Sequence, residues 1–396
     1  MLDNQTNSVV ILSAARTPVG QFQGAFSQVP APKLGAIAIT AALRKSQLKA
    51  SDIQECIMGE VLTAGVGQAP ARQAAIYAGL ENSTVCMTIN KVCGSGLKAV
   101  MLAADSIRLG NTQFAVAGGM ENMTLSPHLM ENARAGYRMG SVQLQDSVIK
   151  DGLWDPYNNW HMGTASELCA KEYNFTRQQQ DEFAINSYKK AQDAWNNQMF
   201  NEEIAPVEIT DKKGTTKIEK DEEPFQAKFD KMPTLRPAFD KEGTVTAANA
   251  SKINDGAAAL ILANESEAKK RNLKPLARIV AQATFAQDPK WFTTAPVGAI
   301  KKVLANAKLN TSDIDLWEIN EAFSNVTMAA MKDLEIPAER VNINGGAVAI
   351  GHPIGASGAR ILTTLVHSLK TKNKKYGLAT LCIGGGEAVA MIIERV

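Results

Sequence analysis

Short apolar runs alternate with longer helical patterns along most of the chain. Runs such as Val85–Ile89 and Phe114–Ala117 predict buried strands, whereas Pro32–Ser46 and Ser95–Leu109 place apolar residues at helical spacing. Alternation of this kind predicts an α/β layered fold. The other expected strands are Val9–Leu12, Cys56–Gly59, Leu316–Ile319, Leu378–Cys382 and Val389–Ile393, and the other expected helices are Pro70–Ala78, Val297–Ala307 and Ser357–Leu369.

The two ends of the chain resemble each other. Ser95-Gly96-Leu97-Lys98 opens an apolar helix that is followed by a strand and by Gly118-Gly119, and Ser357-Gly358-Ala359-Arg360 opens a second such helix before Leu378–Cys382 and Gly384-Gly385-Gly386. The pattern predicts a duplicated strand–helix–strand unit. The alternative is coincidence, because Ser-Gly before a helix is common.

The alternation of short apolar runs and helical patterns is lost between the two halves, over roughly residues 121–248. Thr176 and Gln179 form a capping box before one long helix whose apolar face includes Phe183 and Trp195. The following stretch, Asp211–Lys231, is charged and has little periodicity, but aromatic residues and prolines keep recurring near it. We therefore expect an inserted loop domain here rather than disorder.

Composition excludes several classes of protein. Of the 396 residues, 45% are apolar and 21% charged, and the formal net charge is +2. A net charge this small does not create the positive electrostatic potential that would attract nucleic acid. No apolar run reaches the roughly 18 residues that a membrane helix needs. The N-terminus lacks a signal core and an Arg-rich amphipathic segment. We expect a cytoplasmic protein that binds neither nucleic acid nor membrane.

The first segment with chemical character is Asn90-Lys91-Val92-Cys93-Gly94-Ser95-Gly96. A strand ends, Cys93 follows, and a helix begins at once. That order places the sulfur beside unpaired N–H groups and the positive end of the helix dipole, which favour a thiolate. We expect a lowered pKa at Cys93. The rival interpretation of any one of the five cysteines is a small buried hydrophobe.

The second segment is the glycine-rich turn Gly345–Gly358, which holds His352. A phosphate-binding loop is the rival interpretation, but the segment lacks the Gly-Lys-Ser/Thr ending of a P-loop and the glycine spacing of a dinucleotide fingerprint. A histidine fixed by a following proline suits a base that serves a cysteine.

Two more strand ends carry polar groups: Cys382 before Gly384–Gly386, and Asn320 after Leu316–Ile319. Glycines leave backbone N–H groups open, as an oxyanion hole requires. A lone polar group at a strand end is more often structural. Four such sites together favour a catalytic centre, because open α/β sheets bind ligands at the carboxyl ends of their strands.

These motifs, in this order and together with Gly243–Ala258, resemble the thiolase family over nearly the whole chain. The resemblance implies a thiolase-like five-layer αβαβα fold of two duplicated halves with an inserted loop domain, usually in homotetramers. The implied boundaries are 1–120 for the N-terminal half, 121–248 for a loop domain that binds CoA and makes tetramer contacts, 249–273 for completion of the N-terminal half, and 274–396 for the C-terminal half.

The resemblance also implies catalytic roles. Cys93 would be the acylated nucleophile, His352 would activate it, and Cys382 would move a proton at the substrate α-carbon. Asn320 would hold a water that completes one oxyanion hole with His352, and the N–H groups of Cys93 and Gly384 would form another. Such chemistry needs no redox cofactor, and CoA is substrate and product.

His161-Met162-Gly163 resembles the short-chain members of the family, which condense two acetyl-CoA reversibly to acetoacetyl-CoA and CoA through an acetylated cysteine. The implied contacts to the CoA arm are His161, Met162, Phe239, Ala247, Ser251 and Phe323. An alternative for Ser251 is a helix N-cap before Asn254-Asp255. Where relatives often place an arginine near the adenine, this chain has Glu223-Pro224-Phe225. Two alternatives follow: Lys228 or Lys231 takes over the phosphate, or the 3′-phosphate faces solvent.

Some animal mitochondrial members bind potassium. Their ligands resemble Tyr188, Ala247, Ala248, Ala250 and Val348 here, and hard cations take such oxygen ligands. K⁺ is therefore a candidate ligand.

The nearest rival function is a broad-range 3-ketoacyl-CoA thiolase of fatty-acid breakdown. Ketoacyl synthases and hydroxymethylglutaryl-CoA synthase share the fold but typically lack the second cysteine, so Cys382 argues against them. A non-catalytic CoA-binding scaffold would have lost Cys93, His352 or Cys382, and a nicotinamide dehydrogenase fails on glycine spacing.

Overall fold

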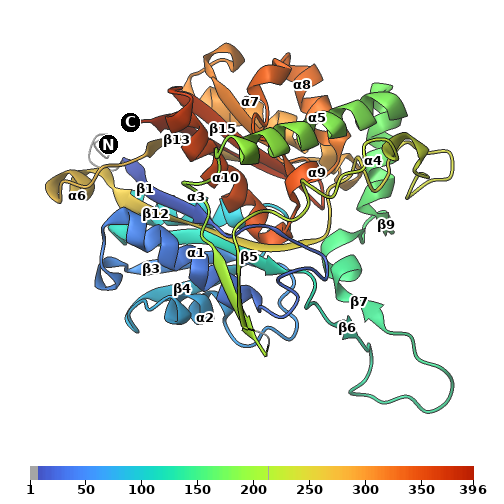
Figure 1. Cartoon of the computed structure of the whole chain (residues 1–396), viewed down its shortest axis with the longest axis horizontal. Helices are drawn as coiled ribbons and strands as arrows, with labels where there is room; N and C mark the ends of the chain where they lie inside the picture. The colour runs from blue at the N-terminus through green and yellow to red at the C-terminus, as the bar shows by residue number, and fades with distance from the viewer. Residues whose placement is uncertain (1–7, 213) are drawn as a thin grey trace.

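A ten-stranded mixed sheet runs through the computed structural model, which describes residues 8–212 and 214–396 (Figure 1). The strand order is β14-β15-β16-β13-β1-β12-β5-β3-β4, and β2 pairs with β12. The N-terminal and C-terminal parts meet between β1 and β13, where the register pairs are Val10↔Arg278 and Ile11↔Ala277. The strands of the sheet are β1 (Val9–Arg16), β2 (Gly20–Gln21), β3 (Glu55–Gly59), β4 (Val85–Ile89), β5 (Phe114–Asn122), β12 (Asn254–Asn264), β13 (Ala277–Ala286), β14 (Leu316–Ile319), β15 (Tyr376–Ile383) and β16 (Glu387–Arg395).

The two halves of the sheet repeat one pattern. In the N-terminal half β3 runs parallel to β5, β5 antiparallel to β12, and β12 antiparallel to β1. In the C-terminal half β14 runs parallel to β15, β15 antiparallel to β16, and β16 antiparallel to β13. In the N-terminal half, β4 pairs with β3 and extends the sheet. At the corresponding position of the C-terminal half, beside β14, there is an isolated parallel bridge between Trp317 and Val341. The predicted duplication is confirmed.

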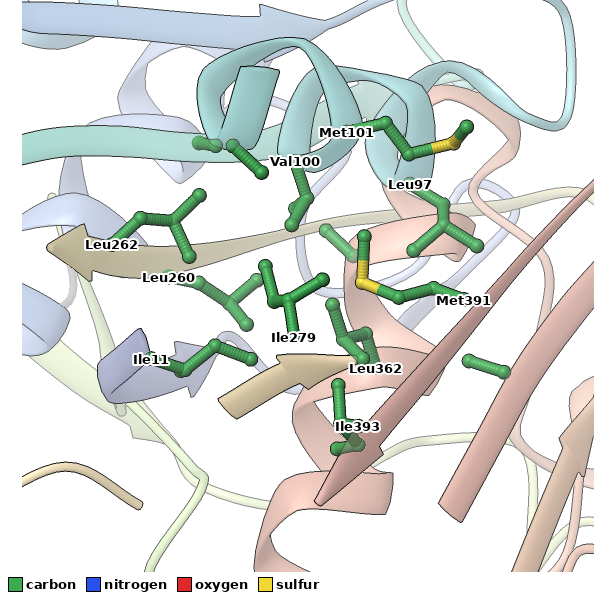
Figure 2. Close-up of a cluster of buried hydrophobic side chains, with 14 of the residues drawn as sticks. Ile11, Leu97, Val100, Met101, Leu260, Leu262, Ile279, Leu362, Met391 and Ile393 are labelled. Carbon is green, nitrogen blue, oxygen red and sulfur yellow. The ribbon is translucent and has the colours of Figure 1, made fainter. Parts of the chain in front are cut away.

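Three hydrophobic clusters fill the spaces between helices and sheet halves, which gives the predicted five layers. The outer clusters lie under α1 and α2 on the N-terminal side and under α7 and α8 on the C-terminal side. The central cluster, drawn in Figure 2, joins both halves through α3 and α10, with Leu97 and Leu362 facing Leu260 and Met391. The helices are α1 (Ala31–Ser46), α2 (Pro70–Tyr77), α3 (Ser95–Arg108), α4 (Met162–Tyr173), α5 (Arg177–Asn196), α6 (Glu265–Lys270), α7 (Ala295–Ala307), α8 (Ser324–Leu334), α9 (Ala347–Ile350) and α10 (Ile354–Thr371).

Small residues allow α3 and α10 to cross closely at their first turns. A Cβ atom added to Gly96 would lie 2.7 Å from the Ala359 nitrogen, and one added to Gly358 would lie 2.3 Å from the Leu97 nitrogen. Side chains at these positions would force the helices apart. The duplicated Ser-Gly motifs thus lie against each other, and the residues just before each helix, Cys93 and His352, are brought to one site.

The segment between the halves is built largely from short elements. It contains β6 (His128–Leu129), β7 (Gln145–Asp146), a π-helical turn over Val148–Leu153, β8 (Trp154–Asp155), β9 (Trp160–His161), α4, α5, β10 (Val207–Asp211) and β11 (Gly214–Ile218). The predicted capping box is present: the Thr176 side chain accepts from the Gln179 N–H, and the Gln179 side chain accepts from the Thr176 N–H. The loop between β6 and β7 projects from the body (Figure 1).

Three elements differ from the sequence-based expectation. The apolar pattern does not predict the strands β12 and β13, and the β10–β11 hairpin lies partly within the charged stretch for which no regular structure is expected. The Asn254-Asp255 pair opens β12 rather than a helix, so the N-cap alternative for Ser251 is wrong. None of the helices within residues 8–212 and 214–396 combines the length and apolar character that crossing a bilayer needs.

Candidate functional site

A cavity of about 460 Å³ lies at the carboxyl ends of strands from both halves. Of the predicted catalytic residues, Cys93, His352 and Gly384 line it. Of the predicted CoA contacts, the lining includes His161, Met162, Phe239, Ala247, Ser251 and Phe323. Residues far apart in the sequence thus share one cavity of the size typical for small-molecule sites.

Cys93 stands on a strained turn between β4 and α3. Val92 has φ 46°, in the left-handed region that a β-branched residue rarely adopts. The Ser95 hydroxyl fixes the turn, because it donates to the Val92 carbonyl oxygen at 2.7 Å and accepts from the Lys91 N–H at 2.8 Å. Strain of this kind persists only where surrounding structure enforces it, and here it presents the sulfur to the cavity.

The prediction of a lowered pKa at Cys93 is wrong for the resting site. Burial raises the pKa of the Cys93 thiol to about 11, although a hydrogen bond from the Gly384 backbone N–H works in the opposite direction. The start of α3 does not compensate for the loss of water around the sulfur. Cys93 therefore rests as a thiol, and its activation needs a base.

His352 is a neutral imidazole, as such a base requires. Burial, helped by the positive charge of Arg360, lowers the pKa of His352 to about 3. The Ser357 hydroxyl donates to the Pro353 carbonyl oxygen at 2.8 Å and lies 2.5 Å from His352 Nδ1. Since the proton of that hydroxyl is already engaged, Nδ1 must carry the hydrogen, and Nε2 keeps a free lone pair.

Asn320 lies behind the histidine rather than on the cavity wall. Its Nδ2 atom is 3.5 Å from His352 Nε2. Its Oδ1 atom is buried and has no hydrogen-bond partner among the described residues. A buried unsatisfied amide oxygen is a place where an ordered water is expected. The next residue, Glu321, accepts from the Ser187 hydroxyl at 2.6 Å and the Val348 N–H at 3.2 Å, which joins α5 to the glycine-rich turn.

Cys382 is fully buried at the end of β15, next to the site but not on the cavity wall. Burial, together with the nearby Cys93, raises the pKa of Cys382 well above its ordinary value. Cys382 packs in the same buried cluster as Met162. Met162 also packs beside Gly384, because the Met162 sulfur would lie 3.5 Å from a Cβ atom added to Gly384. This end of the site therefore holds two thiols, the backbone N–H of Gly384 and one flexible apolar side chain.

Aromatic side chains form the wall farther from the sulfur. His161 stacks on Phe239 with ring centroids 4.7 Å apart, and Phe323 contacts both Phe239 and Phe292 edge to face. The His161 Nδ1 atom accepts from the Gly163 N–H at 3.0 Å and so caps α4. An apolar wall of this kind suits the pantetheine part of CoA.

Two predicted phosphate contacts do not reach this cavity. Lys228 and Lys231 lie outside its lining. The lysine that does line it is Lys252, beside Glu223, and sequence reasoning missed it. A lone lysine after Ser251 reads as a solvated loop residue, and only its proximity to an acidic cavity residue distinguishes it. Of the suggested potassium ligands, Tyr188, Ala248 and Val348 share a buried cluster, Ala250 packs in the neighbouring one, and Ala247 lines the cavity.

Comparison with known proteins decides the family. The family described as "Thiolase, N-terminal domain" matches residues 9–266, and "Thiolase, C-terminal domain" matches residues 273–395. The chain belongs to the thiolase family. The structure is similar to the crystal structure of the Acat5 thiolase from Ascaris suum in complex with coenzyme A, with a TM-score of 0.94 and 43% identity, covering 98% of this chain and 100% of that one.

Curated relatives narrow the resemblance within the thiolases. The acetyl-CoA acetyltransferase of Cupriavidus necator is 53% identical over 98% of this chain and 99% of its own length. The mitochondrial acetyl-CoA acetyltransferase of Bos taurus is 50% identical over 98% of this chain and 92% of its own length. Both matches extend through the thiolase site described above.

Proposed function

We propose that this thiolase is an acetyl-CoA C-acetyltransferase, which interconverts acetoacetyl-CoA plus CoA with two molecules of acetyl-CoA. The observation that carries the proposal is that the Cys93 thiol and the neutral His352 imidazole share one cavity, with the Cys382 thiol buried next to it and Gly384 donating its N–H to Cys93. The names of the similar proteins favour the acetyl substrate.

Thiolysis begins from the resting protonation states. His352 Nε2 takes the proton of Cys93, and the thiolate attacks the keto carbon of acetoacetyl-CoA. The oxyanion accepts hydrogen bonds from the backbone N–H groups of Cys93 and Gly384. The bond between the α-carbon and the keto carbon then breaks, the α-carbon takes the proton of Cys382, and acetyl-CoA leaves. A raised pKa suits Cys382, because it must begin as an acid.

The second half returns the acetyl group to CoA. The incoming CoA thiol gives its proton to the Cys382 thiolate and attacks the carbonyl carbon of acetyl-Cys93. The backbone N–H groups of Cys93 and Gly384 again stabilise the oxyanion, because it forms on the same acetyl oxygen. A water held by Asn320 and the protonated His352 instead bind the thioester oxygen of acetyl-CoA while its α-carbon is deprotonated. Cys93 leaves and recovers its proton from His352, and every group is back in its starting form. Condensation is the same sequence reversed.

The test is acetylation by labelled acetyl-CoA, followed by an acid quench and peptide mapping. We expect one label per active subunit on the peptide that contains Cys93 and none in Cys93→Ala. Label on Cys382, or full acylation of Cys93→Ala, would refute the assignment. Thiolysis rates across 3-ketoacyl-CoAs of increasing length separate this function from the broad-range alternative, which predicts comparable rates on long chains.

We also propose a homotetramer. The loop between β6 and β7 carries exposed apolar side chains, among them Met139 at 98% exposure, and edge strand β4 exposes Val85 and Met87. Apolar loops and open strand edges of this kind are normally covered by another chain. Sedimentation should give four chains for the native protein, fewer after replacement of residues 131–143 by a short glycine–serine turn, and fewer after Val85→Lys.

A cytoplasmic site of action is also part of the proposal. The five cysteines are all free, which suits a reducing compartment. Because the Bos taurus relative is mitochondrial, fractionation of source cells is the deciding measurement.

A further inference from the structure

Three of the five residues suggested as potassium ligands, Ala247, Ala248 and Ala250, belong to a loop, residues 246–250, that forms one wall of the cavity. The Thr246 carbonyl oxygen accepts from the Ala250 N–H at 3.1 Å, and the Asn249 side chain accepts from the Thr246 N–H at 2.8 Å. The Asn249 Nδ2 donates to Asp181 of α5 at 2.8 Å, which attaches the loop to the helix that carries Tyr188. The position of this loop therefore sets the shape of the cavity beside Ala247 and Ser251.

A lysine already lies among the suggested ligands. Lys252 Nζ donates to the Ala250 carbonyl oxygen at 3.2 Å and lies 5.6 Å from the centre of the Tyr188 ring. Lys252 lines the same cavity wall as Ala247 and Ala250. Its ammonium thus bridges two of the five proposed ligands, one from the loop and one from α5.

A lysine side chain is ordinarily an ammonium at neutral pH. Glu223 lines the same cavity as Lys252, and its carboxylate attracts the ammonium. Glu223 in turn is held by Asn254, whose Nδ2 lies 3.4 Å from Glu223 Oε1 and whose Oδ1 accepts from the His352 N–H at 2.9 Å. The carboxylate that attracts Lys252 is thus linked through Asn254 to the backbone of His352.

These residues do not suit a free potassium ion. A hard cation needs a full shell of oxygen ligands, and the Ala250 oxygen is already bound by an ammonium. A second positive charge beside that ammonium would also be repelled in a site shielded from water. The donor set that could hold K⁺ in a chain without this lysine is here occupied by a side chain.

We propose that the Lys252 ammonium acts as a tethered replacement for an exchangeable monovalent cation, so that the cavity wall is held in place without K⁺. Lys252 is a positioning residue in this proposal: it fixes residues 246–250 against α5 and does not touch the reacting atoms. The activity readout rests on the proposed acetyl-transfer function, whereas the stability readout does not.

The first experiment uses the unmodified protein. Thiolysis of acetoacetyl-CoA and the thermal unfolding midpoint are measured in KCl, NaCl and tetramethylammonium chloride at one ionic strength. We expect rates within about twofold and equal midpoints, because the cation is built in. A saturable activation or stabilisation by KCl that NaCl does not reproduce would overturn the proposal, since an ion would then bind in addition to Lys252.

The second experiment removes the tether. Lys252→Thr should lose roughly tenfold in kcat/KM in NaCl and recover in KCl with saturation, and KCl should raise its unfolding midpoint more than NaCl does. Lys301→Thr, a change at an exposed lysine on α7, is the matched control and should respond to neither salt. Full activity of Lys252→Thr without K⁺, or a loss that K⁺ does not repair, counts against the tether.

Lys252→Arg keeps the test available if the threonine variant does not fold. It retains a positive charge, so its rate and midpoint should be the same in KCl and NaCl, and activation by K⁺ would contradict the proposal. Failure of the proposed function would look different: no thiolysis in any salt, with unfolding midpoints that still answer the question about the cation.

Discussion

The Ser357 hydroxyl lies 2.5 Å from His352 Nδ1 and donates its own proton to the Pro353 carbonyl oxygen, 2.8 Å away. This relationship fixes the imidazole tautomer, with the free lone pair on Nε2. A base that must accept the Cys93 proton needs that tautomer, so the serine controls catalysis without touching the substrate.

Ser357→Ala should therefore lower kcat for thiolysis with little change in KM. We expect roughly a 10-fold to 100-fold loss, part of the 10²–10⁴ that a positioned base contributes. Ser368→Ala is the control, because Ser368 is also buried on α10 but contacts Asn344 rather than His352. Equal losses in the two variants would mean that the effect is one of stability.

The pKa of Cys93, about 11, and that of His352, about 3, define a neutral resting pair at pH 7. Alkylation of Cys93 by iodoacetamide should consequently rise with pH from 7 toward 10, because the thiolate fraction grows until the pH passes the thiol pKa. His352→Ala should slow alkylation at neutral pH by removing the proton acceptor. A rate that is already flat below pH 7 would indicate a resting thiolate and contradict the neutral pair.

Cys382→Ser should separate acyl transfer from proton transfer. Serine keeps the shape but has a much higher pKa, so the α-carbon would lose its acid and base while Cys93, His352 and Gly384 stay in place. With labelled acetyl-CoA in deuterated water, we expect acetyl-enzyme still to form, because the departing CoA is a stable thiolate that can leave without a proton from residue 382, and α-proton exchange to be nearly abolished. Persistent exchange together with condensation would require a different base.

Met162 should limit the acyl chain. It is 7% exposed and packs beside Gly384, where the acyl group bound to Cys93 would lie. A methylene is worth about 1–3 kcal/mol in such a pocket, so Met162→Ala should shift specificity from acetoacetyl-CoA toward the longer substrate 3-ketohexanoyl-CoA, by about tenfold or more in the ratio of their specificity constants. Met232→Ala, a buried methionine outside the cavity, should leave the ratio unchanged.

We predict that Glu60 makes the free energy of unfolding fall as the pH rises. It is fully buried, neither carboxylate oxygen has a partner among the described residues, and burial beside Glu121 raises its pKa to about 9. The pKa of Glu60 in the folded protein lies above the ordinary value of 4.5. The contribution of the protonated Glu60 to stability is therefore fully present below about pH 4.5 and is lost as the pH rises toward 9. Glu60→Gln should raise the free energy of unfolding at pH 8.5 by more than about 1 kcal/mol. Urea titrations at pH 5.5 and 8.5 check it, and a gain of the same size at both values would exclude titration as the cause.

The outline of the fold could be predicted because buried strands such as β1 and β5 are continuous apolar runs. The strand β12 could not, since alanine has a low strand propensity and its run reads equally well as helix. Its extended form comes from pairing with β1 and β5 on either side. Such tertiary constraints leave no local signal.

The candidate site, like the fold, could be predicted from the sequence only in part. Cys93, His352 and Cys382 stand out by residue type at strand ends, and their order along the chain carries the family resemblance. The protonation state of Cys93 depends on how much water reaches the sulfur, which only the packed structure fixes. Lys252 was missed for a related reason: its significance lies in what surrounds it, namely Ala250 and Tyr188.

The pairing of β1 with β12 has a consequence for how the chain is made. Val9 pairs with Asn264, so β1, once it has left the ribosome, waits for a partner that is encoded some two hundred and fifty residues later. At the usual 5–20 residues per second this delay lasts on the order of tens of seconds. During that time β1 offers an unpaired apolar edge on both sides. Chaperones that shield nascent strands should therefore act on the N-terminal half before the C-terminal half exists.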